Sequence, residues 1–162
     1  IMSRISVLFV CLGNICRSPT AHAVFQSMVD KQGLSDQIYV DSCGTGDWHI
    51  GYAPDPRSQQ HALDRGYQMD NLRARLVNDQ DFDQFDYILV MDKQNLADLK
   101  AMNCQNFTGE LGLFLDFCRN PNFSDYSEVP DPYYSGDQGF SFVLDLIEDA
   151  SAELLLQIKD RI

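Results

Sequence analysis

The sequence predicts an α/β fold in which a parallel sheet of four strands has helices on both faces. Short β-branched and aromatic runs alternate with segments of helical periodicity. This alternation implies right-handed crossovers between parallel strands. A chain of 162 residues has the length of one domain and folds without disulfides. We therefore expect a single domain over residues 1–162, with Ile1 as a cloning remnant before Met2.

The elements follow in order along the chain. A strand over residues 5–10 leads into a glycine-containing turn and a helix whose apolar face carries Ala21, Val24, Phe25 and Met28. Further strands are expected over 38–41, 87–91 and 111–117, and further helices over 57–65 and 95–101. Apolar side chains at helical spacing predict a closing amphipathic helix over 140–162. The segment before it, 119–137, is rich in Pro, Asn, Ser and Asp, and loops of this length are usually functional or disordered.

Composition and charge exclude several classes of function. Twelve basic and twenty-four acidic residues give a net charge of -12, which disfavours nucleic acid and anionic membranes as partners. The longest apolar run, Val7–Leu12, is too short to cross a bilayer, and no secretion signal is evident. Five scattered cysteines lack a C-x-x-C pair, and His22, His49 and His61 lack ligand spacing. We expect a monomeric cytoplasmic protein without metal or cofactor.

An anion-binding loop is predicted where the first strand leads into the first helix. Residues 11–18 have the sequence CLGNICRS, in which five residues separate Cys11 from Arg17. Backbone N–H groups of such a loop point inward and bind a tetrahedral anion at the positive end of the helix dipole. The dipole and Arg17 favour a thiolate, so we expect the pKa of Cys11 to lie well below about 8.5. We call this segment the phosphate loop; its expected phosphate-binding residues are Leu12, Gly13, Asn14, Ile15, Cys16, Arg17 and Ser18.

Side chains within the phosphate loop suggest individual roles. The planar fork of Arg17 matches two phosphate oxygens, a geometry that lysine lacks. Gly13 and Asn14 tolerate the positive φ that a tight loop often needs. Ser18 is placed either to cap the helix or to direct its hydroxyl toward the Cys11 sulfur. Taken alone, the spacing is equally compatible with a buried free cysteine and a helix capped by serine.

The segment VCLGNICRSPTA resembles the active-site loop of the low-molecular-weight protein tyrosine phosphatases. The likeness covers nearly the whole chain and continues through Asp41-Ser42, Asp47-Trp48, Pro54-Asp55-Pro56-Arg57, Phe85-Asp86-Tyr87-Ile88-Leu89, Met91-Asp92, Asn95-Leu96 and Val129-Pro130-Asp131-Pro132-Tyr133-Tyr134. The resemblance implies a flavodoxin-like doubly wound fold, strand order 2-1-3-4, with the loop at the topological switch point. It also implies hydrolysis of phosphotyrosine and other aryl phosphate monoesters through a phosphocysteine intermediate. Phosphotyrosyl proteins or peptides would then be substrates, and phosphate-like oxyanions inhibitors.

The resemblance assigns Asp131 as general acid, beside Cys11 as nucleophile and Arg17 as phosphate clamp. Pro130 and Pro132 flank Asp131 and restrict the backbone that holds its carboxyl group. Asp131 would first protonate the leaving group and then, as a carboxylate, activate the water that attacks the intermediate. A bell-shaped pH profile is expected.

Aromatic side chains are expected to form the walls of the substrate pocket. Trp48 and Tyr133 resemble the family's aromatic walls, which would sandwich a phenyl ring and leave phosphoserine too short to reach Cys11. Tyr134 is assigned to substrate recognition with them. Cys16 lies in the same loop as Cys11, and in this family a disulfide between the two positions would protect the nucleophile from over-oxidation.

Two positions depart from the family pattern. Leu72 stands where many members carry a histidine in the hydrogen-bond network behind the phosphate loop. His22 replaces an acidic residue that is common near the pocket rim. With these changes, Ser18 and Ser42 are expected to hold Asn14 in place.

Three other functions share parts of this pattern. An arsenate reductase needs two further cysteines close together, whereas Cys104 and Cys118 fall in different expected elements. Phosphoarginine phosphatases typically have threonine at the position of Ile15. A catalytically silent phosphopeptide-binding module would lack the nucleophile, the clamp or the acid. All three are present, and the sequence favours a tyrosine phosphatase.

Overall fold

The computed structural model describes residues 4–102 and 104–162, with Tyr134 described by its backbone alone. Its strands are β1 (Ile5–Cys11), β2 (Ile38–Gly44), β3 (Tyr87–Val90) and β4 (Glu110–Leu113). They pair in parallel in the order β2-β1-β3-β4. The predicted fold class and strand order are therefore confirmed. Ile1 lies outside the described residues.

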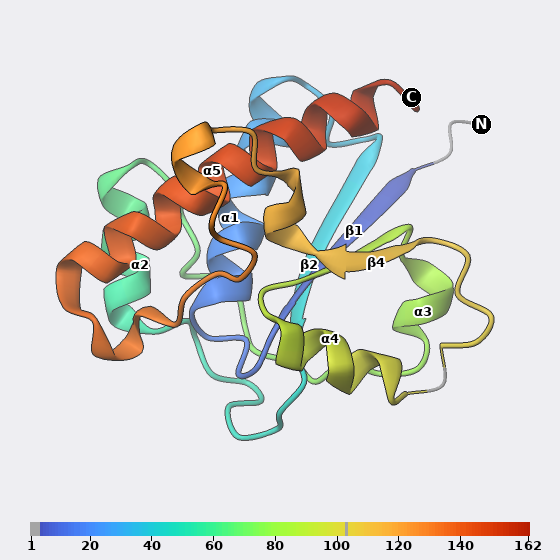
Figure 1. Cartoon of the computed structure of the whole chain (residues 1–162), viewed down its shortest axis with the longest axis horizontal. Coiled ribbons are helices and arrows are strands. Elements are labelled where there is room, and N and C mark those ends of the chain that lie inside the picture. The colour runs from blue at the N-terminus through green and yellow to red at the C-terminus, as the bar shows by residue number, and fades with distance from the viewer. Residues whose placement is uncertain (1–3, 103) are drawn as a thin grey trace.

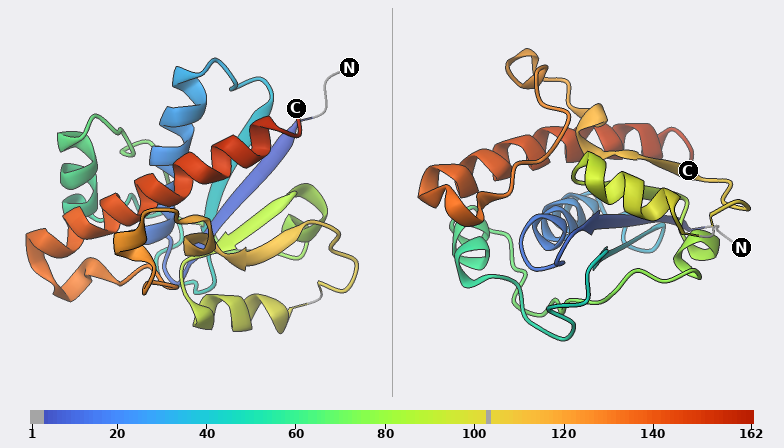
Figure 2. Two further views of the ribbon diagram at one scale, coloured as in Figure 1. Left: turned by 45° about the horizontal axis from the view of Figure 1, so that its top comes forward. Right: turned by 60° about the horizontal axis from the view of Figure 1, so that its bottom comes forward.

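Helices cover both faces of the sheet, as expected (Figures 1 and 2). One side carries α1, α2 and α5, and the other carries α3 and α4. Among the helices within residues 4–102 and 104–162, none combines the length and the hydrophobicity that a membrane span requires. The helix bounds are Arg17–Lys31 for α1, Pro56–Asp64 for α2, Asp81–Gln84 for α3, Lys93–Lys100 for α4 and Gly136–Lys159 for α5.

The alternating side chains of the central strand β1 supply two hydrophobic cores. Phe9 faces α1 and lies edge-on to Phe25, 5.8 Å away, and to Phe114, 4.9 Å away between ring centroids. Leu8 points to the opposite face and belongs to the smaller cluster with Leu99 of α4. Because both faces are covered, the strand has a continuous apolar sequence rather than an alternating one. β1 ends at Cys11, which is also the first residue of the phosphate loop.

Apart from shifts of one or two residues, four elements differ from the prediction. The strand expected over 38–41 continues to Gly44. The strand expected over 111–117 ends at Leu113, and Phe114–Phe117 form a 3₁₀ turn that buries Phe114 and Phe117. The last helix begins at Gly136 and ends at Lys159 rather than spanning 140–162. The four-residue helix α3 was not predicted, because it is too short to display helical periodicity.

The topology places the phosphate loop at a switch point of the sheet. From β1 the chain passes through α1 to β2 on one side, and β3 pairs with β1 on the other. In open α/β sheets, ligands bind outside the carboxyl ends of the strands at such points. The loop after β2 and the segment before α5 both reach this end of the sheet (Figure 1).

Candidate active site

The phosphate loop wraps around the sulfur of Cys11. Cys11 is the last residue of β1 and is 3% exposed. The backbone N–H of Asn14 donates to Cys11 Sγ at 3.2 Å, and Ser18 Oγ lies 3.0 Å from the same sulfur. Arg17, the first residue of α1, is also buried. The loop therefore surrounds a thiol with hydrogen-bond donors at the start of a helix.

Asn14 holds the loop in its unusual shape. Its φ is +56°, and no other non-glycine residue in the described ranges has a positive φ. Its side-chain Nδ2 donates to Ser18 Oγ at 2.8 Å, and its Oδ1 accepts from the backbone N–H of Arg75 at 3.0 Å. The prediction of positive φ is thus confirmed for Asn14 and wrong for Gly13. At Gly13 a Cβ would lie 3.1 Å from the ring of His49, a tight contact that a larger residue could make only if that ring shifted by a few tenths of an ångström.

The structure decides between the two roles expected for Ser18 and corrects the one expected for Ser42. Ser18 does not cap α1, because the helix begins at Arg17 and its capping position, Cys16, makes no side-chain cap bond. The other alternative agrees with the structure: Ser18 Oγ contacts the Cys11 sulfur, and it also donates to the carbonyl of Cys43. Ser42 was expected to hold Asn14, but its hydroxyl lies 3.0 Å from Nδ1 of His22. Besides the contact from Ser18, the Asn14 side chain is held by the backbone N–H of Arg75, a residue that no local sequence signal identifies.

The carboxyl end of β2 packs directly on the phosphate loop. The N–H of Thr45 donates to the carbonyl of Cys11 at 3.0 Å, and that of Gly46 donates to the carbonyl of Leu12 at 2.9 Å. A Cβ on Gly44 would lie 2.7 Å from the carbonyl oxygen of Leu12. Real Cβ atoms do not approach this closely, so only glycine allows the strand and loop to lie so near each other. No role was predicted for Gly44 from the sequence.

An acidic side chain, Asp92, holds the guanidinium of Arg17 in place. Its Nη1 donates to Asp92 at 2.8 Å and to the carbonyl of Val129 at 3.1 Å. Asp92 also caps α4 by accepting from the backbone N–H of Asn95. Burial would lower the pKa of Arg17, but Cys11 and Asp92 raise it above its ordinary value. The guanidinium therefore stays charged in a buried position, and Asp92, to which the sequence analysis assigned no role, is its ion-pair partner.

One cavity of about 460 Å³ unites most of the predicted site residues. Asn14 and Ser18 are not part of its lining and support the loop instead. His49 and Tyr52 belong to the wall, although sequence reasoning gave them no role there. The lining is formed by Cys11, Leu12, Gly13, Ile15, Cys16, Arg17, Trp48, His49, Tyr52, Ala53, Asp55, Pro56, Asp131 and Tyr133.

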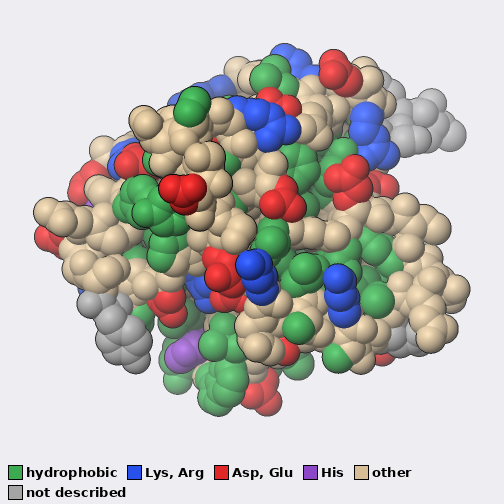
Figure 3. Space-filling model, in the orientation of Figure 1, with side chains coloured by type: hydrophobic (Ala, Val, Ile, Leu, Met, Phe, Trp, Pro, Cys, Tyr) green, Lys and Arg blue, Asp and Glu red, His purple; other side chains and the backbone are tan. Residues whose placement is uncertain are grey.

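The rim of the cavity is aromatic and exposed. Trp48 is 67% exposed, and Ile50 and Tyr52 in the same loop also expose large apolar side chains. Figure 3 shows hydrophobic side chains gathered beside a histidine at the lower edge of the molecule, where this loop lies in Figure 1. Tyr133 stands at the rim with Trp48. The side chain of Tyr134 lies outside the described part, so its predicted role has no structural counterpart here.

A short 3₁₀ turn and Arg57 fix the loop that carries Asp131. Asp131 Oδ1 accepts from the backbone N–H of Tyr133 at 3.0 Å, which caps the 3₁₀ turn Pro132–Tyr134. Arg57 of α2 donates to the carbonyl of Tyr133 at 2.9 Å, and its guanidinium lies 4.7 Å from the centre of that ring. The same guanidinium lies 5.1 Å from the ring of Phe140. The segment is therefore anchored on α2 and α5, with Asp131 exposed toward the cavity.

Cys16 lines the same cavity as Cys11. Both are free, buried thiols. Burial raises the pKa of Cys16 to about 12, against a hydrogen bond with Ser58 that lowers it, while Asp55 and Cys11 raise it further. Cys16 is consequently a neutral thiol at physiological pH.

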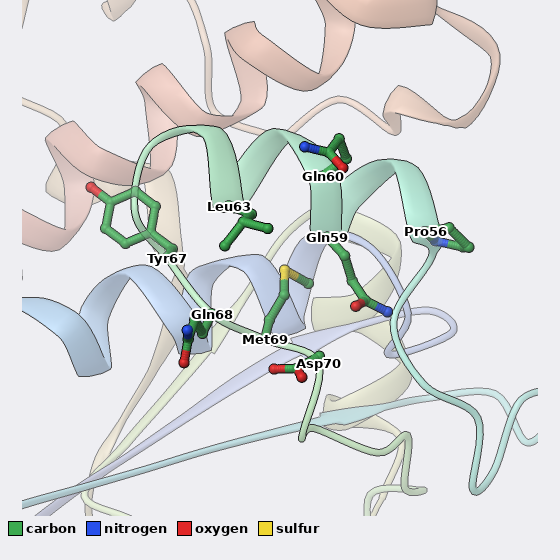
Figure 4. A pocket seen from close by; sticks show the side chains of 8 residues that line it. All are labelled: Pro56, Gln59, Gln60, Leu63, Tyr67, Gln68, Met69 and Asp70. Atoms are coloured by element: carbon green, nitrogen blue, oxygen red, sulfur yellow. The ribbon is translucent and has the colours of Figure 1, made fainter.

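A second hollow, of about 400 Å³, lies beside α2 (Figure 4). Gln59, Leu63 and Met69 point into the space between α2 and the segment that follows it. Its lining lacks the combination of thiol and guanidinium found in the first cavity. The lining residues are Pro56, Gln59, Gln60, Leu63, Tyr67, Gln68, Met69 and Asp70.

Comparison with known proteins identifies the family. Residues 6–162 match the family of low molecular weight phosphotyrosine protein phosphatases. The low molecular weight protein-tyrosine-phosphatase YfkJ of Bacillus subtilis is 44% identical over 155 residues, which are 96% of each chain. A protein tyrosine phosphatase of Entamoeba histolytica, solved with Hepes in its active site, superposes with a TM-score of 0.90 at 38% identity, covering 96% of this chain and 97% of that one.

The Drosophila arginine phosphatase has the same fold, with a TM-score of 0.86 at 34% identity over 94% of this chain and 97% of its own. Similarity of fold therefore includes enzymes of more than one substrate preference. The family match spans nearly the whole chain and includes the phosphate loop. The chain belongs to the low-molecular-weight phosphotyrosine protein phosphatase family.

Proposed function

We propose that this chain hydrolyses phosphotyrosine monoesters with Cys11 as nucleophile, Arg17 as phosphate clamp and Asp131 as general acid. One observation carries the proposal: a single cavity is lined by a thiol, a buried guanidinium and a carboxylate from a separate loop. These are the groups that phosphoryl transfer through a cysteine requires. Membership of a phosphotyrosine phosphatase family supports the same chemistry.

In the first step the Cys11 thiolate attacks phosphorus. The S–P bond forms as the P–O bond to tyrosine breaks, and the leaving oxygen takes a proton from Asp131. Arg17 binds the phosphoryl oxygens with its Nε and Nη2 edge, because the contacts to Asp92 and Val129 use Nη1. Backbone N–H groups of the phosphate loop and the start of α1 bind the same oxygens.

In the second step water releases phosphate from Cys11. Asp131, now a carboxylate, takes a proton from water, whose oxygen attacks phosphorus as the S–P bond breaks. The departing thiolate accepts the Asn14 N–H at 3.2 Å and lies 3.0 Å from the Ser18 hydroxyl. Hydrogen bonds to an ionised sulfur are stronger than those to a thiol, so the Asn14 N–H favours its departure. The Ser18 hydroxyl adds to this when it turns its single proton from the carbonyl of Cys43 to the sulfur.

The aromatic rim supports a preference for aryl phosphates. Trp48 and Tyr133 line the cavity and present rings that suit stacking on a phenyl group. Ile15 adds an apolar side chain to the same wall. We propose phosphotyrosine rather than phosphoserine or phosphoarginine as the substrate. Phosphate-like oxyanions are proposed inhibitors, and the sulfonate Hepes in the active site of the Entamoeba relative supports that proposal.

Redox control and a reducing environment are further proposals. Peroxide would oxidise Cys11 to a sulfenic acid, and the Cys16 thiol would attack that sulfur to form a disulfide with loss of water. The shared cavity supports this pairing. Five free cysteines support a cytoplasmic location, and we propose that the protein acts there as a monomer.

Removal of the nucleophile or the clamp should abolish turnover. In Cys11→Ser, kcat on nitrophenyl phosphate should fall by at least ~10⁴-fold, because an alcohol is not ionised at neutral pH. Arg17→Lys should lose about 10²-fold or more by losing bidentate contact. Cys104→Ser and Arg119→Lys are matched controls that should retain activity. Substantial activity in Cys11→Ser, or loss of parent activity to a chelator with recovery on adding metal, would contradict the mechanism.

The role of Asp131 should appear in the dependence on leaving group. Asp131→Asn should slow phenyl phosphate about 10²-fold or more, but nitrophenyl phosphate much less, because nitrophenolate needs little protonation. Asp125→Asn in the same loop serves as the control. Equal slowing of both esters would remove Asp131 from the acid role.

Treatment with peroxide should show whether Cys16 protects the Cys11 sulfur from over-oxidation or only fills space in the loop. After brief peroxide treatment, dithiothreitol should restore activity in the parent and much less in Cys16→Ser. Peptide mass spectrometry should find a Cys11 to Cys16 disulfide in the treated parent. Equal recovery of both proteins, or absence of that linkage, would leave Cys16 as a packing residue.

A further inference from the structure

His22 attaches α1 to the strand beside the phosphate loop. Its Nδ1 lies 3.0 Å from the hydroxyl of Ser42 in β2. One turn earlier on the same helix face, Ser18 Oγ donates to the carbonyl of Cys43 at 3.2 Å. Two successive turns of α1 are therefore bonded to two consecutive residues of β2.

These bonds lie next to the Cys11 sulfur. Ser18 Oγ is 3.0 Å from Cys11 Sγ and accepts from Asn14 Nδ2 at 2.8 Å. A shift of the first turns of α1 along β2 would move the Ser18 hydroxyl away from the sulfur. The contact between His22 and Ser42 opposes such a shift one turn further along the helix.

Asp41 of the same strand supports the phosphate loop at Asn14, through Arg75. Asp41 accepts from the N–H of Ser42 at 2.8 Å, and its second oxygen accepts from Nε of Arg75 at 3.1 Å. The backbone N–H of Arg75 then donates to Asn14 Oδ1 at 3.0 Å. Residues 41–43 of β2 thus connect to both Asn14 and Ser18.

Leu72 cannot provide the contact that His22 makes. It packs partly buried against the larger hydrophobic cluster and has no polar side-chain atom. His22 and Leu72 line the same surface hollow of about 760 Å³, one from α1 and the other from the segment after α2. Within the described residues, the imidazole of His22 is the side-chain partner of the Ser42 hydroxyl.

We propose that neutral His22 is a positioning residue for the phosphate loop, which acts through Ser42 to hold α1 where Ser18 reaches the Cys11 sulfur. This rests on the proposed role of Cys11 as nucleophile. A neutral ring with its proton on Nε2 accepts from the Ser42 hydroxyl at Nδ1, whereas the imidazolium donates at both nitrogens. Protonation of His22 therefore reverses this hydrogen bond, so that the Ser42 oxygen accepts from Nδ1 and its own proton must turn elsewhere.

The surroundings of His22 favour the neutral ring. Burial lowers its pKa below the ordinary value of 6.5, Asp41 opposes this and Arg75 adds to it. Asp30, Lys31 and Asp70 line the adjoining hollow. Because the unfolded chain takes up this proton first, the contribution of His22 to stability is complete above pH 6.5. It is lost as the pH falls from 6.5 toward the lower pKa of the folded state.

Three substitutions separate the imidazole contact from simple packing. Asn places an amide near the position of Nδ1 and does not titrate, whereas Gln and Ala remove the contact. His22→Ala and His22→Gln should each reduce kcat and the rate of Cys11 alkylation by iodoacetate at pH 6 about fivefold to tenfold, the size of one lost hydrogen bond. His22→Asn should keep both rates near those of the parent. Gln26→Ala, one turn along α1 in the same hollow, is the control that should change neither.

Ser42→Ala and the pH dependence of stability complete the test. Ser42→Ala should match the loss in His22→Ala, and the double variant should lose no more, because both remove one contact. Urea midpoints at pH 7.5 and 5.5 should fall more for the parent than for His22→Asn. Equal rates in all His22 variants, or equal losses in His22→Asn and His22→Ala, would overturn the proposal. If the parent shows no phosphatase activity, the proposed function fails, and the alkylation rates alone decide the role of His22.

Discussion

The backbone of Asn14 is the constraint on which the rest of the site depends. A left-handed conformation costs a residue with a Cβ about 1–2 kcal/mol, so the surrounding structure must hold it. Ser18 and the backbone of Arg75 do so by binding both ends of the Asn14 amide. As a result the Asn14 N–H points at the Cys11 sulfur. The loop is therefore held in this shape by its own contacts, as the proposed binding of a phosphoryl group requires.

An ion pair behind the phosphate loop positions the guanidinium of Arg17. Asp92 neutralises part of the positive charge of Arg17 and holds its Nη1 nitrogen in place. The remaining edge of the guanidinium is positioned without reorganisation, the condition under which buried donors stabilise a transition state most effectively. Asp131 comes from a different segment, anchored through Arg57, through the bond from the Val129 N–H to the Met91 carbonyl, and through the Val129 carbonyl that accepts from Arg17. The proposed nucleophile and the proposed acid thus come from different segments and line one cavity.

The sequence predicted the parts of this arrangement that depend on local order. Strand and helix periodicity located β1 and α1, and the spacing of Cys11 and Arg17 identified the loop between them. The family resemblance supplied strand order and pointed to Asp131. Contacts between distant residues were not predictable in this way: the bond from Arg75 to Asn14 spans 61 residues, and that from Arg17 to Asp92 spans 75. Ser42 was assigned the wrong partner for the same reason.

The central claim is that phosphate passes through a covalent bond to Cys11. The most direct measurement is rapid acid quenching of the parent enzyme during turnover of an aryl phosphate, followed by peptide mass spectrometry. We predict a phosphorylated peptide whose modified residue is Cys11, formed within one turnover and lost as the substrate is exhausted. Normal turnover without any phosphorylated Cys11, or with the phosphoryl group on another residue, would contradict the account.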